Sequence, residues 1–536
     1  MTNRIFSLIV AATLSCATAS GKTPSIIPEP ASIEVTDSTR CYDLRHGMGV
    51  WAAADALPAA NYLVVYCRDR LGLPLEIVPH KASASIVIDG TGNDDSYTLQ
   101  VGDNGITING GSGRGSFYGV QTLIQMLPTR AGDVPQIPFV RIADTPRYQY
   151  RGMHLDVVRH FFTVSFVKRF IDWLALHKMN VFHWHLTDDQ GWRIEIKSHP
   201  ELTGIGSSRT GEIKGLFPGE YYDRPHQAYY TQDEIREVID YAAARYVTVV
   251  PEIDIPGHCM AVLAAHPEFS TTPDQPKHTA RTWGIYNREN NVLTPCDGVF
   301  KLLDDVFGEV CDLFPGEYIH AGGDECAPRW WNDNPETQKF MSDHGIADAK
   351  GMQAYFMQYV QRIVNSHGKT VVGWDGGAEG FWPQGSALEC WLVKPDMAQN
   401  RINTTHKWIN ASNRCHYFVS HEDSIQTELS PWKSRLTVKA VYEAPLVPDS
   451  ASRVTADNLI GVEGCCWTEY APDEWKIEML VFPRLAALAE KGWCGYRPDH
   501  WEDFANRLVR QLDRYDLWRI RYNPAFERTV ATPRPR

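Results

Sequence analysis

The first part of the chain alternates apolar and polar residues over short runs. This alternation at residues 83–90 and 96–111 predicts β-strands, and the turn residues at 103–105 predict a hairpin within the second run. Apolar residues at helical spacing predict helices at 56–72 and 115–129. We therefore expect a small α/β domain with an antiparallel sheet.

From residue 148 onward, short apolar runs alternate with amphipathic helices. Eight expected strands lie at residues 151–158, 180–187, 247–254, 317–325, 370–376, 387–392, 415–419 and 459–467. Strands that alternate with helices in this way are typical of a (β/α)8 TIM barrel, an α/β fold with parallel strands. The amphipathic segment at 501–520 is expected to pack on the barrel.

Length and charge limit the organisation and the partners of the chain. Its 536 residues suit more than one domain. We expect a signal peptide at residues 1–20, a non-catalytic α/β domain at 21–147, a (β/α)8 catalytic domain at 148–525 and a tail at 526–536. The formal net charge of −13 argues against nucleic acid as a partner and leaves neutral sugars open.

The N-terminus has the pattern of an export signal. Arg4 precedes the apolar stretch 5–14, and Ala17-Thr18-Ala19 follows as an A-x-A cleavage site. The apolar stretch is too short for a permanent membrane span. Cys16 leaves two interpretations open, an ordinary cleaved signal or a lipid anchor at this residue. We expect an exported protein that is periplasmic, secreted or anchored to the outer membrane as a lipoprotein.

The cysteine and histidine patterns do not predict a metal or a disulfide framework. The twelve cysteines are scattered, and no C-x-x-C pair or zinc-like Cys/His spacing occurs. His183 and His185 lie on one side of an expected strand, but no third ligand follows at a fixed spacing. We therefore expect no metal and no cofactor.

Charged and aromatic residues stand at the ends of the expected strands. Active sites of TIM barrels form at the C-terminal ends of the strands. Aromatic rings pack on the apolar face of a sugar, whereas carboxylates and arginine bind its hydroxyls. The pattern therefore indicates a polar site with aromatic walls. Its residues are Asp156, Arg159, His185, Asp188, Glu252, Asp254, His258, Asp324, Glu325, Trp374, Trp391, Tyr417, Trp467 and Glu469.

Five motifs, in this order, resemble glycoside hydrolase family 20, the β-N-acetylhexosaminidases. Residues 115–125 also resemble the non-catalytic α/β domain of that family. The resemblance covers essentially the whole mature chain. It implies an exported bacterial enzyme that removes terminal, non-reducing, β-linked N-acetylglucosamine or N-acetylgalactosamine from glycans with retention. The motifs are R-G-x-x-L-D-x-x-R (151–159), W-H-L-T-D-D-Q-G-W-R (184–193), P-E-I-D-x-P-G-H (251–258), H-x-G-G-D-E (320–325) and W-T-E (467–469).

The resemblance assigns the central chemistry to two adjacent carboxylates. Glu325 corresponds to the general acid, which protonates the glycosidic oxygen and later activates water, and such an acid needs a raised pKa. Asp324 corresponds to the residue that orients the 2-acetamido group of the substrate. That group attacks C1 in place of a protein nucleophile and forms an oxazolinium ion, as in other substrate-assisted glycosidases. Adjacent carboxylates are expected to titrate as a coupled pair.

Further roles follow from the same resemblance. Arg159 corresponds to the residue that binds the 3- and 4-hydroxyls, and Asp188 and His258 correspond to a dyad that supports the acid. Tyr417 corresponds to the donor to the acetamide oxygen, and Glu469 to a residue that binds the 4- or 6-hydroxyl. The aromatic walls correspond to Trp374, Trp391 and Trp467, with Trp432 as a further candidate.

One departure and two other functions stay open. The Y-L/F-D segment of the family reads Tyr417-Phe418-Val419 here, which leaves the preference for gluco or galacto sugars undetermined. A non-catalytic glycan-binding protein on a degenerate barrel is the first alternative. The second is a two-carboxylate β-glycosidase, whose nucleophile lies about 5–5.5 Å from the acid. The requirement for the acetamide distinguishes these functions. The natural glycan, its linkage and the oligomeric state do not follow from the sequence.

Overall fold

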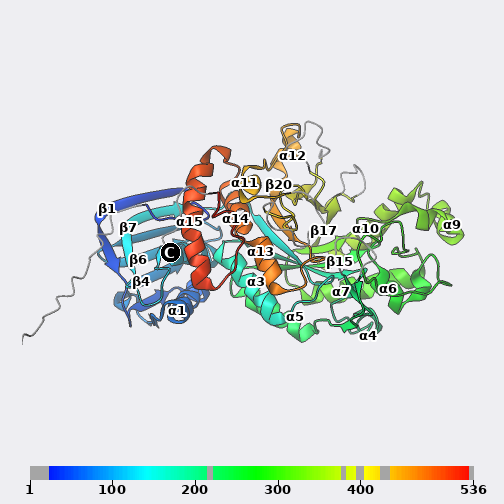
Figure 1. Cartoon of the computed structure of the whole chain (residues 1–536), viewed down its shortest axis with the longest axis horizontal. Helices are drawn as coiled ribbons and strands as arrows, with labels where there is room; N and C mark the ends of the chain where they lie inside the picture. The colour runs from blue at the N-terminus through cyan, green and yellow to red at the C-terminus, as the bar shows by residue number, and fades with distance from the viewer. Residues whose placement is uncertain (1–22, 214–220, 376–381, 394–403, 423–434, 530–536) are drawn as a thin grey trace, which may run out of the picture.

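The computed structural model describes residues 23–213, 221–375, 382–393, 404–422 and 435–529. The expected signal peptide, with Cys16, and residues 530–536 of the expected tail lie outside these ranges. Two domains lie side by side, an N-terminal one around a sheet and a second one around a barrel (Figure 1). None of the helices formed by the described residues has the length and apolarity needed to cross a membrane.

The N-terminal domain is built on a mixed seven-stranded sheet. The strand order is β1 (Ser32–Asp43), β7 (Gln136–Asp144), β5 (Tyr97–Gly102), β6 (Gly105–Gly110), β4 (Ile86–Gly90), β2 (Gly49–Ala52) and β3 (Glu76–Ile77). Strands β1, β7, β5 and β6 pair antiparallel, as predicted, and β6, β4, β2 and β3 extend the sheet with parallel pairs. The reason for the parallel pairs is α1 (Leu57–Leu71), which crosses over between two strands and returns the chain parallel. Helix α2 (Gly113–Met126) packs beside α1 on the sheet.

The hairpin predicted at residues 103–105 is confirmed. Strands β5 and β6 pair antiparallel, and Gly102 stands opposite Gly105 across the turn. Gly105 has a φ of 101°, and a Cβ there would lie 2.2 Å from the Ser85 carbonyl oxygen. Only glycine, which has no Cβ, fits this backbone conformation so close to the segment at Ser85.

The second domain is a closed barrel of eight parallel strands, as predicted. The last strand pairs with the first over six register positions, Gly461 to Cys466 against Tyr150 to Leu155. In barrel order the strands are β8 (Tyr150–Asp156), β9 (Val181–Asp188), β15 (Thr248–Ile255), β16 (Tyr318–Gly322), β17 (Thr370–Asp375), β18 (Ala387–Cys390), β19 (Lys407–Asn410) and β20 (Leu459–Cys466).

The seventh strand is not the predicted one. It is β19, whereas the predicted segment 415–419 forms only a bridge between Tyr417 and Cys465. The Asn410 side chain accepts a hydrogen bond from the Ser412 amide at 3.0 Å, and the chain turns there. The segment then runs back along the end of β20, where the Phe418 amide donates to the Cys465 carbonyl at 2.8 Å. Tyr417 still reaches the C-terminal end of the barrel by this route.

Helices surround the barrel and shorter elements decorate its loops. Helix α5 begins with a capping box, because the Thr231 side chain accepts from the Glu234 amide and the Glu234 carboxylate accepts in return. The longer helices are α3 (Val164–Leu176), α5 (Gln232–Ala243), α7 (Asp297–Leu313), α9 (Pro335–Asp343), α10 (Ala349–Ser366) and α14 (Arg484–Cys494). The shorter elements are α4 (Glu201–Gly204), α6 (Met260–Ala265), α8 (Pro328–Asn332), α11 (Val438–Glu443), α12 (Arg453–Asp457), α13 (Glu474–Val481), β10 (Gly191–Trp192), β11 (Ser208–Arg209), β12 (Glu212–Ile213), β13 (Tyr221–Tyr222) and β14 (His226–Gln227).

Helix α15 (Trp501–Trp518) contacts both domains rather than the barrel alone. It lies between them, drawn in red in Figure 1. On the N-terminal domain, Arg514 Nη2 donates to the Gln125 carbonyl at 2.6 Å and Trp518 Nε1 donates to the Tyr66 hydroxyl at 2.8 Å. On the barrel side, the Tyr515 hydroxyl lies 2.8 Å from His177 Nε2. These side chains are buried, so the helix joins the two domains through their cores.

Candidate active site

Two glycines shape the turn that presents the adjacent carboxylates. Gly322 ends β16 and Gly323 follows it, with φ values of 63° and 100°. A Cβ at Gly322 would lie 1.7 Å from Asp254 Oδ1, the atom that accepts the Gly323 amide at 3.1 Å. Glu325 itself has a φ of 44°, an uncommon conformation for a residue with a side chain. Such backbone strain concentrates at functional sites.

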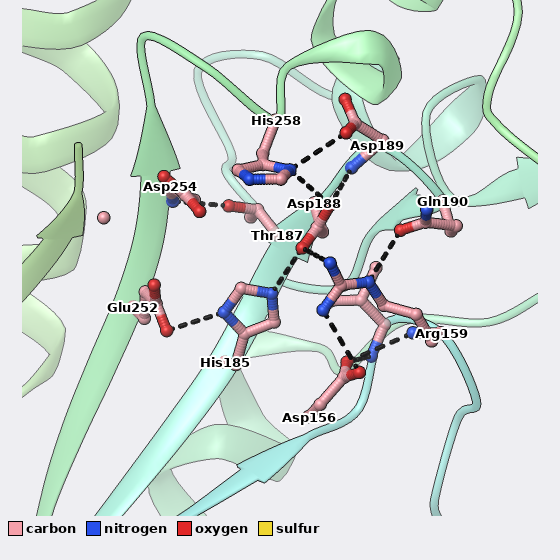
Figure 2. Close-up of polar contacts among 12 residues, drawn as sticks. Asp156, Arg159, His185, Thr187, Asp188, Asp189, Gln190, Glu252, Asp254 and His258 are labelled. Carbon is pink, nitrogen blue, oxygen red and sulfur yellow. Dashed lines mark hydrogen bonds and ion pairs between the residues drawn. The ribbon is translucent and has the colours of Figure 1, made fainter. Parts of the chain in front are cut away.

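Asp188 connects the residues around it (Figure 2). Its Oδ2 lies 2.6 Å from Arg159 Nη2 and 2.9 Å from His185 Nε2, and its Oδ1 lies 3.2 Å from His258 Nδ1. Burial opposes the charge of Asp188, but Arg159 and His258 outweigh it and hold the pKa of this carboxyl well below its ordinary value. Asp188 is therefore a buried carboxylate that fixes a guanidinium and two imidazoles.

His258 joins this network to Glu325. Its Nδ1 lies 2.9 Å from Asp189 Oδ2, closer than Asp188, and its Nε2 lies 3.4 Å from Glu325 Oε2. Burial works against a charged imidazole, but Asp188 and Asp189 raise the pKa of His258 well above its ordinary value. An imidazolium therefore faces Glu325. The sequence prediction paired His258 with Asp188 alone, although Asp189 was visible as the second aspartate of the W-H-L-T-D-D motif.

Glu325 is accessible, and its charge is stabilised. Its side chain is 44% exposed. Burial of the carboxyl raises its pKa, but the contact with His258 outweighs that effect, and the pKa of Glu325 is lowered. The expected raised pKa is therefore wrong for the protein without substrate. The aromatic walls and the neighbouring carboxylate do not overcome the adjacent imidazolium.

Asp324 carries the opposite perturbation. Burial raises its pKa to about 7; Glu325 and Glu252 act in the same direction, and His258 opposes them. Its Oδ1 is buried and has no hydrogen-bond partner among the described residues. A buried acceptor without a donor is costly, which points to a ligand donor at this position. Asp324 therefore holds a proton more readily than an ordinary aspartate, whereas Glu325 is stabilised as the carboxylate.

Aromatic rings close around these groups. Trp374 and Trp467 have ring centroids 5.7 Å apart, and the Tyr417 ring lies 6.1 Å from that of Trp467. The Arg159 guanidinium lies 5.0 Å from the centre of the Trp467 ring. Trp391 packs at the edge of the same cluster. These predicted residues come together, whereas Trp432 lies outside the described residues.

Arg159 and Glu469 lie together at the ends of β8 and β20. Beyond Asp188, Arg159 is held by Gln190 Oε1 at 2.9 Å and by Asp156 at 3.4 Å. Burial raises the pKa of Glu469, and Arg159 opposes this. Gln190 was missed by the sequence analysis, although it follows the two aspartates in the same motif. The guanidinium is fixed before any ligand arrives.

A buried layer of histidine and glutamate lies beneath the site. Glu252 accepts from Trp374 Nε1 at 2.7 Å and lies 2.6 Å from His185 Nδ1 and 3.0 Å from His183 Nε2. His183 Nδ1 lies 2.6 Å from Glu463. The sequence analysis left Glu252 without an assigned role. In the structure it fixes the orientation of a wall tryptophan and of the histidine that contacts Asp188.

Comparison with known proteins identifies the family. Residues 148–496 match the family described as "Glycosyl hydrolase family 20, catalytic domain", and residues 23–145 match "Glycosyl hydrolase family 20, domain 2". The chain belongs to glycosyl hydrolase family 20. Together the two matches span nearly all of the chain from residue 23 to residue 496.

Relatives and solved structures resemble the family 20 chain over most of its length. A Beta-hexosaminidase of Porphyromonas gingivalis is 33% identical over 513 residues, which are 93% of this chain and 64% of that protein. A Beta-hexosaminidase of Vibrio furnissii is 35% identical over 88% of this chain and 76% of its own. The GH20 exo β-N-acetylglucosaminidase of Vibrio harveyi, in complex with N-acetylglucosamine, has a TM-score of 0.81 at 28% identity and covers 95% of this chain and 79% of its own. A Streptomyces plicatus N-acetyl-β-hexosaminidase has a TM-score of 0.77 at 31% identity, over 93% of this chain and 96% of its own.

Proposed function

We propose that the protein hydrolyses terminal, non-reducing, β-linked N-acetylglucosamine or N-acetylgalactosamine from glycans, with retention and through an oxazolinium intermediate. One observation carries the proposal: Asp324 presents a buried oxygen without a donor, directly beside the accessible carboxyl of Glu325. A 2-acetamido N–H is a donor that satisfies such an oxygen. The β-hexosaminidase relatives and the family 20 structure that contains N-acetylglucosamine support the same substrate class.

We infer that substrate binding favours protonation of Glu325, the residue that donates the proton, over protonation of Asp324. When the acetamide N–H donates to Asp324, its ionised form is stabilised and its pKa falls. The leaving group covers Glu325 and removes water from it, which raises the pKa of Glu325. Protonation therefore shifts from Asp324 toward Glu325 on binding. The Tyr417 hydroxyl, the predicted donor to the acetamide oxygen, keeps that oxygen directed at C1.

The chemistry then follows in two balanced steps. Glu325 donates its proton to the glycosidic oxygen as the C1–O bond breaks and the acetamide oxygen bonds to C1. The Asp324 carboxylate stabilises the positive oxazolinium ion, and the His258 imidazolium stabilises the new Glu325 carboxylate. Glu325 next takes a proton from water, whose oxygen attacks C1 and releases the acetamide. Two inversions at C1 leave its configuration retained.

Binding of the sugar rests on groups fixed in advance. Arg159, anchored by Asp188 and Gln190, is placed to bind the outer hydroxyls together with Glu469. Val419 is buried and packs in the cluster with Trp374 and Tyr417, so no carboxylate reaches the sugar from this position. We propose that this loss weakens discrimination between equatorial and axial 4-hydroxyls. This proposal is tested by the ratio of the kcat/KM values for the aryl N-acetylglucosaminide and the aryl N-acetylgalactosaminide. In the wild type the two values should be similar, and Val419→Asp should make them differ more.

The decisive experiment compares an aryl β-N-acetylglucosaminide with the matching aryl β-glucoside. Without the acetamide the nucleophile is missing, so kcat should collapse as well as binding. The Asp324→Asn variant should lose most kcat on the first substrate, while the surface variant Asp343→Asn serves as the matched control. Similar rates on both substrates would refute substrate assistance and favour a two-carboxylate glycosidase. Binding of N-acetylglucosamine without hydrolysis of any glycan would favour a glycan-binding protein.

We also propose that the protein is exported, on the strength of Arg4, the apolar stretch 5–14 and the A-x-A pattern. Cell fractionation of the full chain separates periplasmic, secreted and membrane-anchored protein. If Cys16 carries a lipid, Cys16→Ala should release the protein from the membrane fraction. If the signal is simply cleaved, this substitution should change nothing.

A further inference from the structure

Two histidines on the outside of the barrel converge on a single carboxylate. Glu201 begins α4, His199 precedes that helix, and His266 follows the last residue of α6. Glu201 Oε1 lies 3.1 Å from His199 Nδ1 and 3.0 Å from His266 Nε2. The three atoms all lie within 4.8 Å of one another. The cluster is separate from the active site, since none of its members contacts Asp188, His258 or Glu325 in the interactions described above.

Each imidazole turns its other nitrogen to a further carboxylate. His199 Nε2 lies 3.0 Å from Asp305 Oδ2 on α7, and His266 Nδ1 lies 3.2 Å from Glu268 Oε1. When these nitrogens carry the protons, His199 Nδ1 and His266 Nε2 can offer lone pairs to a cation at the centre of the cluster; without a cation, His199 Nδ1 lies within hydrogen-bond distance of Glu201. A carboxylate behind each histidine is the arrangement that orients ligands around zinc and raises their basicity.

The geometry of one contact separates this cluster from an ordinary ion pair. His266 Nε2 is buried, and its approach to Glu201 does not have hydrogen-bond geometry, so this nitrogen has no hydrogen-bond partner among the described residues. A buried nitrogen without a partner is unfavourable. A cation between the two imidazoles and Glu201 would satisfy it.

We propose that His199, Glu201 and His266 bind a Zn²⁺ ion, with water as the fourth ligand. Zinc bonds of about 2.0–2.2 Å place tetrahedral donors roughly 3.3 Å apart, close to the two separations seen here. Two imidazoles select zinc over calcium or magnesium, which prefer oxygen ligands. The three side chains are 19%, 33% and 14% exposed, so a water molecule can reach the ion. The sequence pattern predicted no metal, because recognisable metal motifs have ligands at short fixed spacing and His266 comes from a distant segment.

The ion would connect two segments that matter for the fold of the active site. Helix α6 begins two residues after His258, and the zinc site would fix the other end of that helix to α4. The two helices already contact each other. The bound metal is therefore expected to stabilise the folded protein and to leave the chemistry to the active-site residues.

The test is zinc binding to the full chain after removal of any affinity tag and of bound metal. Titration calorimetry should give one Zn²⁺ per chain, and Zn²⁺ should raise Tm, because a ligand of the native state alone stabilises it. His266→Gln and Glu201→Gln should each weaken binding by about 100-fold or more and abolish the rise in Tm. Asp305→Asn should weaken it by roughly 10-fold, the effect typical of a group behind a ligand. His367→Gln is the control, since His367 is an exposed histidine outside this cluster whose Nδ1 lies 3.2 Å from the carboxylate of Asp312.

A lack of saturable zinc binding would overturn the proposal. So would zinc binding that His266→Gln and Glu201→Gln leave unchanged, because the ion would then occupy another site. Circular dichroism establishes whether each variant is folded. If His266→Gln does not fold, zinc binding by Glu201→Gln alone decides between the proposed site and another one. Hydrolysis of aryl N-acetylglucosaminide is measured separately, so failure here does not affect the proposed enzymatic function.

Discussion

Replacing Asp189 by Asn should slow hydrolysis without much effect on substrate binding. Asp189 Oδ2 contacts His258 at 2.9 Å, and Oδ1 accepts the Met260 amide at 3.1 Å. Both oxygens therefore face donors, and an amide can satisfy only one of them. The substitution also removes a negative charge that keeps His258 protonated. Because His258 faces Glu325, the loss is felt when the proton leaves Glu325 in the transition state.

The magnitude follows from the contacts. A hydrogen bond to a charged group contributes about 1.5–3 kcal/mol, and Asp188, 3.2 Å from the same nitrogen, retains part of that stabilisation. A net loss of about 2 kcal/mol in transition-state stabilisation corresponds to roughly a 30-fold lower kcat/KM at 1.36 kcal/mol per tenfold. Asp188→Asn should cost more and should raise KM as well, because it also releases Arg159.

The assay is steady-state hydrolysis of an aryl β-N-acetylglucosaminide over a range of pH. Asp189→Asn should lower kcat with little change in KM, and kcat should fall further at high pH, where His258 now loses its proton more easily. A purely structural defect would lower Tm without that pH dependence. The reasoning is refuted if Asp189→Asn is as active as the wild type, or if it raises KM as much as Asp188→Asn does.

Three further predictions concern the proton, the tyrosine and the domain contact. The pKa of Asp324 is about 7, so the carboxyl of Asp324 in the free enzyme loses its proton as pH rises through that value. Because that proton is needed for catalysis, kcat/KM should fall above about pH 7. A flat profile of kcat/KM up to about pH 9 would contradict this. With bound substrate the proton is on Glu325, so the basic limb of kcat should lie at higher pH than that of kcat/KM. Tyr417→Phe should lower kcat by about 100–1000-fold, the range for loss of a donor that stabilises the reacting oxygen, and an unchanged kcat would exclude Tyr417 from the mechanism. Tyr66→Phe leaves the buried Trp518 N–H without an acceptor and should cost about 1–3 kcal/mol, visible as a lower Tm with unchanged kcat.

Much of the site could be predicted because its residues occupy the ends of strands in short motifs. Asp188 is the last residue of β9 and Asp324 lies two residues after β16, and barrel closure brings such strand ends together. The error at β19 has a local cause, since the real strand has four residues and ends where Asn410 turns the chain. The residues around Tyr417 match the pattern of a strand better than those of β19, but they form only an isolated bridge.

Electrostatics was the least predictable part. The pKa of Glu325 depends on how close His258 comes, and the charge of His258 depends in turn on two aspartates from another strand end. None of these distances can be read from residue order. Likewise, the partners of His199 lie on separate helices, so the zinc proposal depends on tertiary structure alone.

Helix α15 makes the boundary near residue 147 a poor place to cut the chain. A barrel expressed without the N-terminal domain would expose the buried guanidinium of Arg514 and the indole N–H of Trp518, both of which have their acceptors on that domain. The isolated N-terminal domain would in turn lose the donors to Gln125 and Tyr66. Transplanting this catalytic barrel into another protein would therefore require its neighbour to be carried along, because the two domains share one interior.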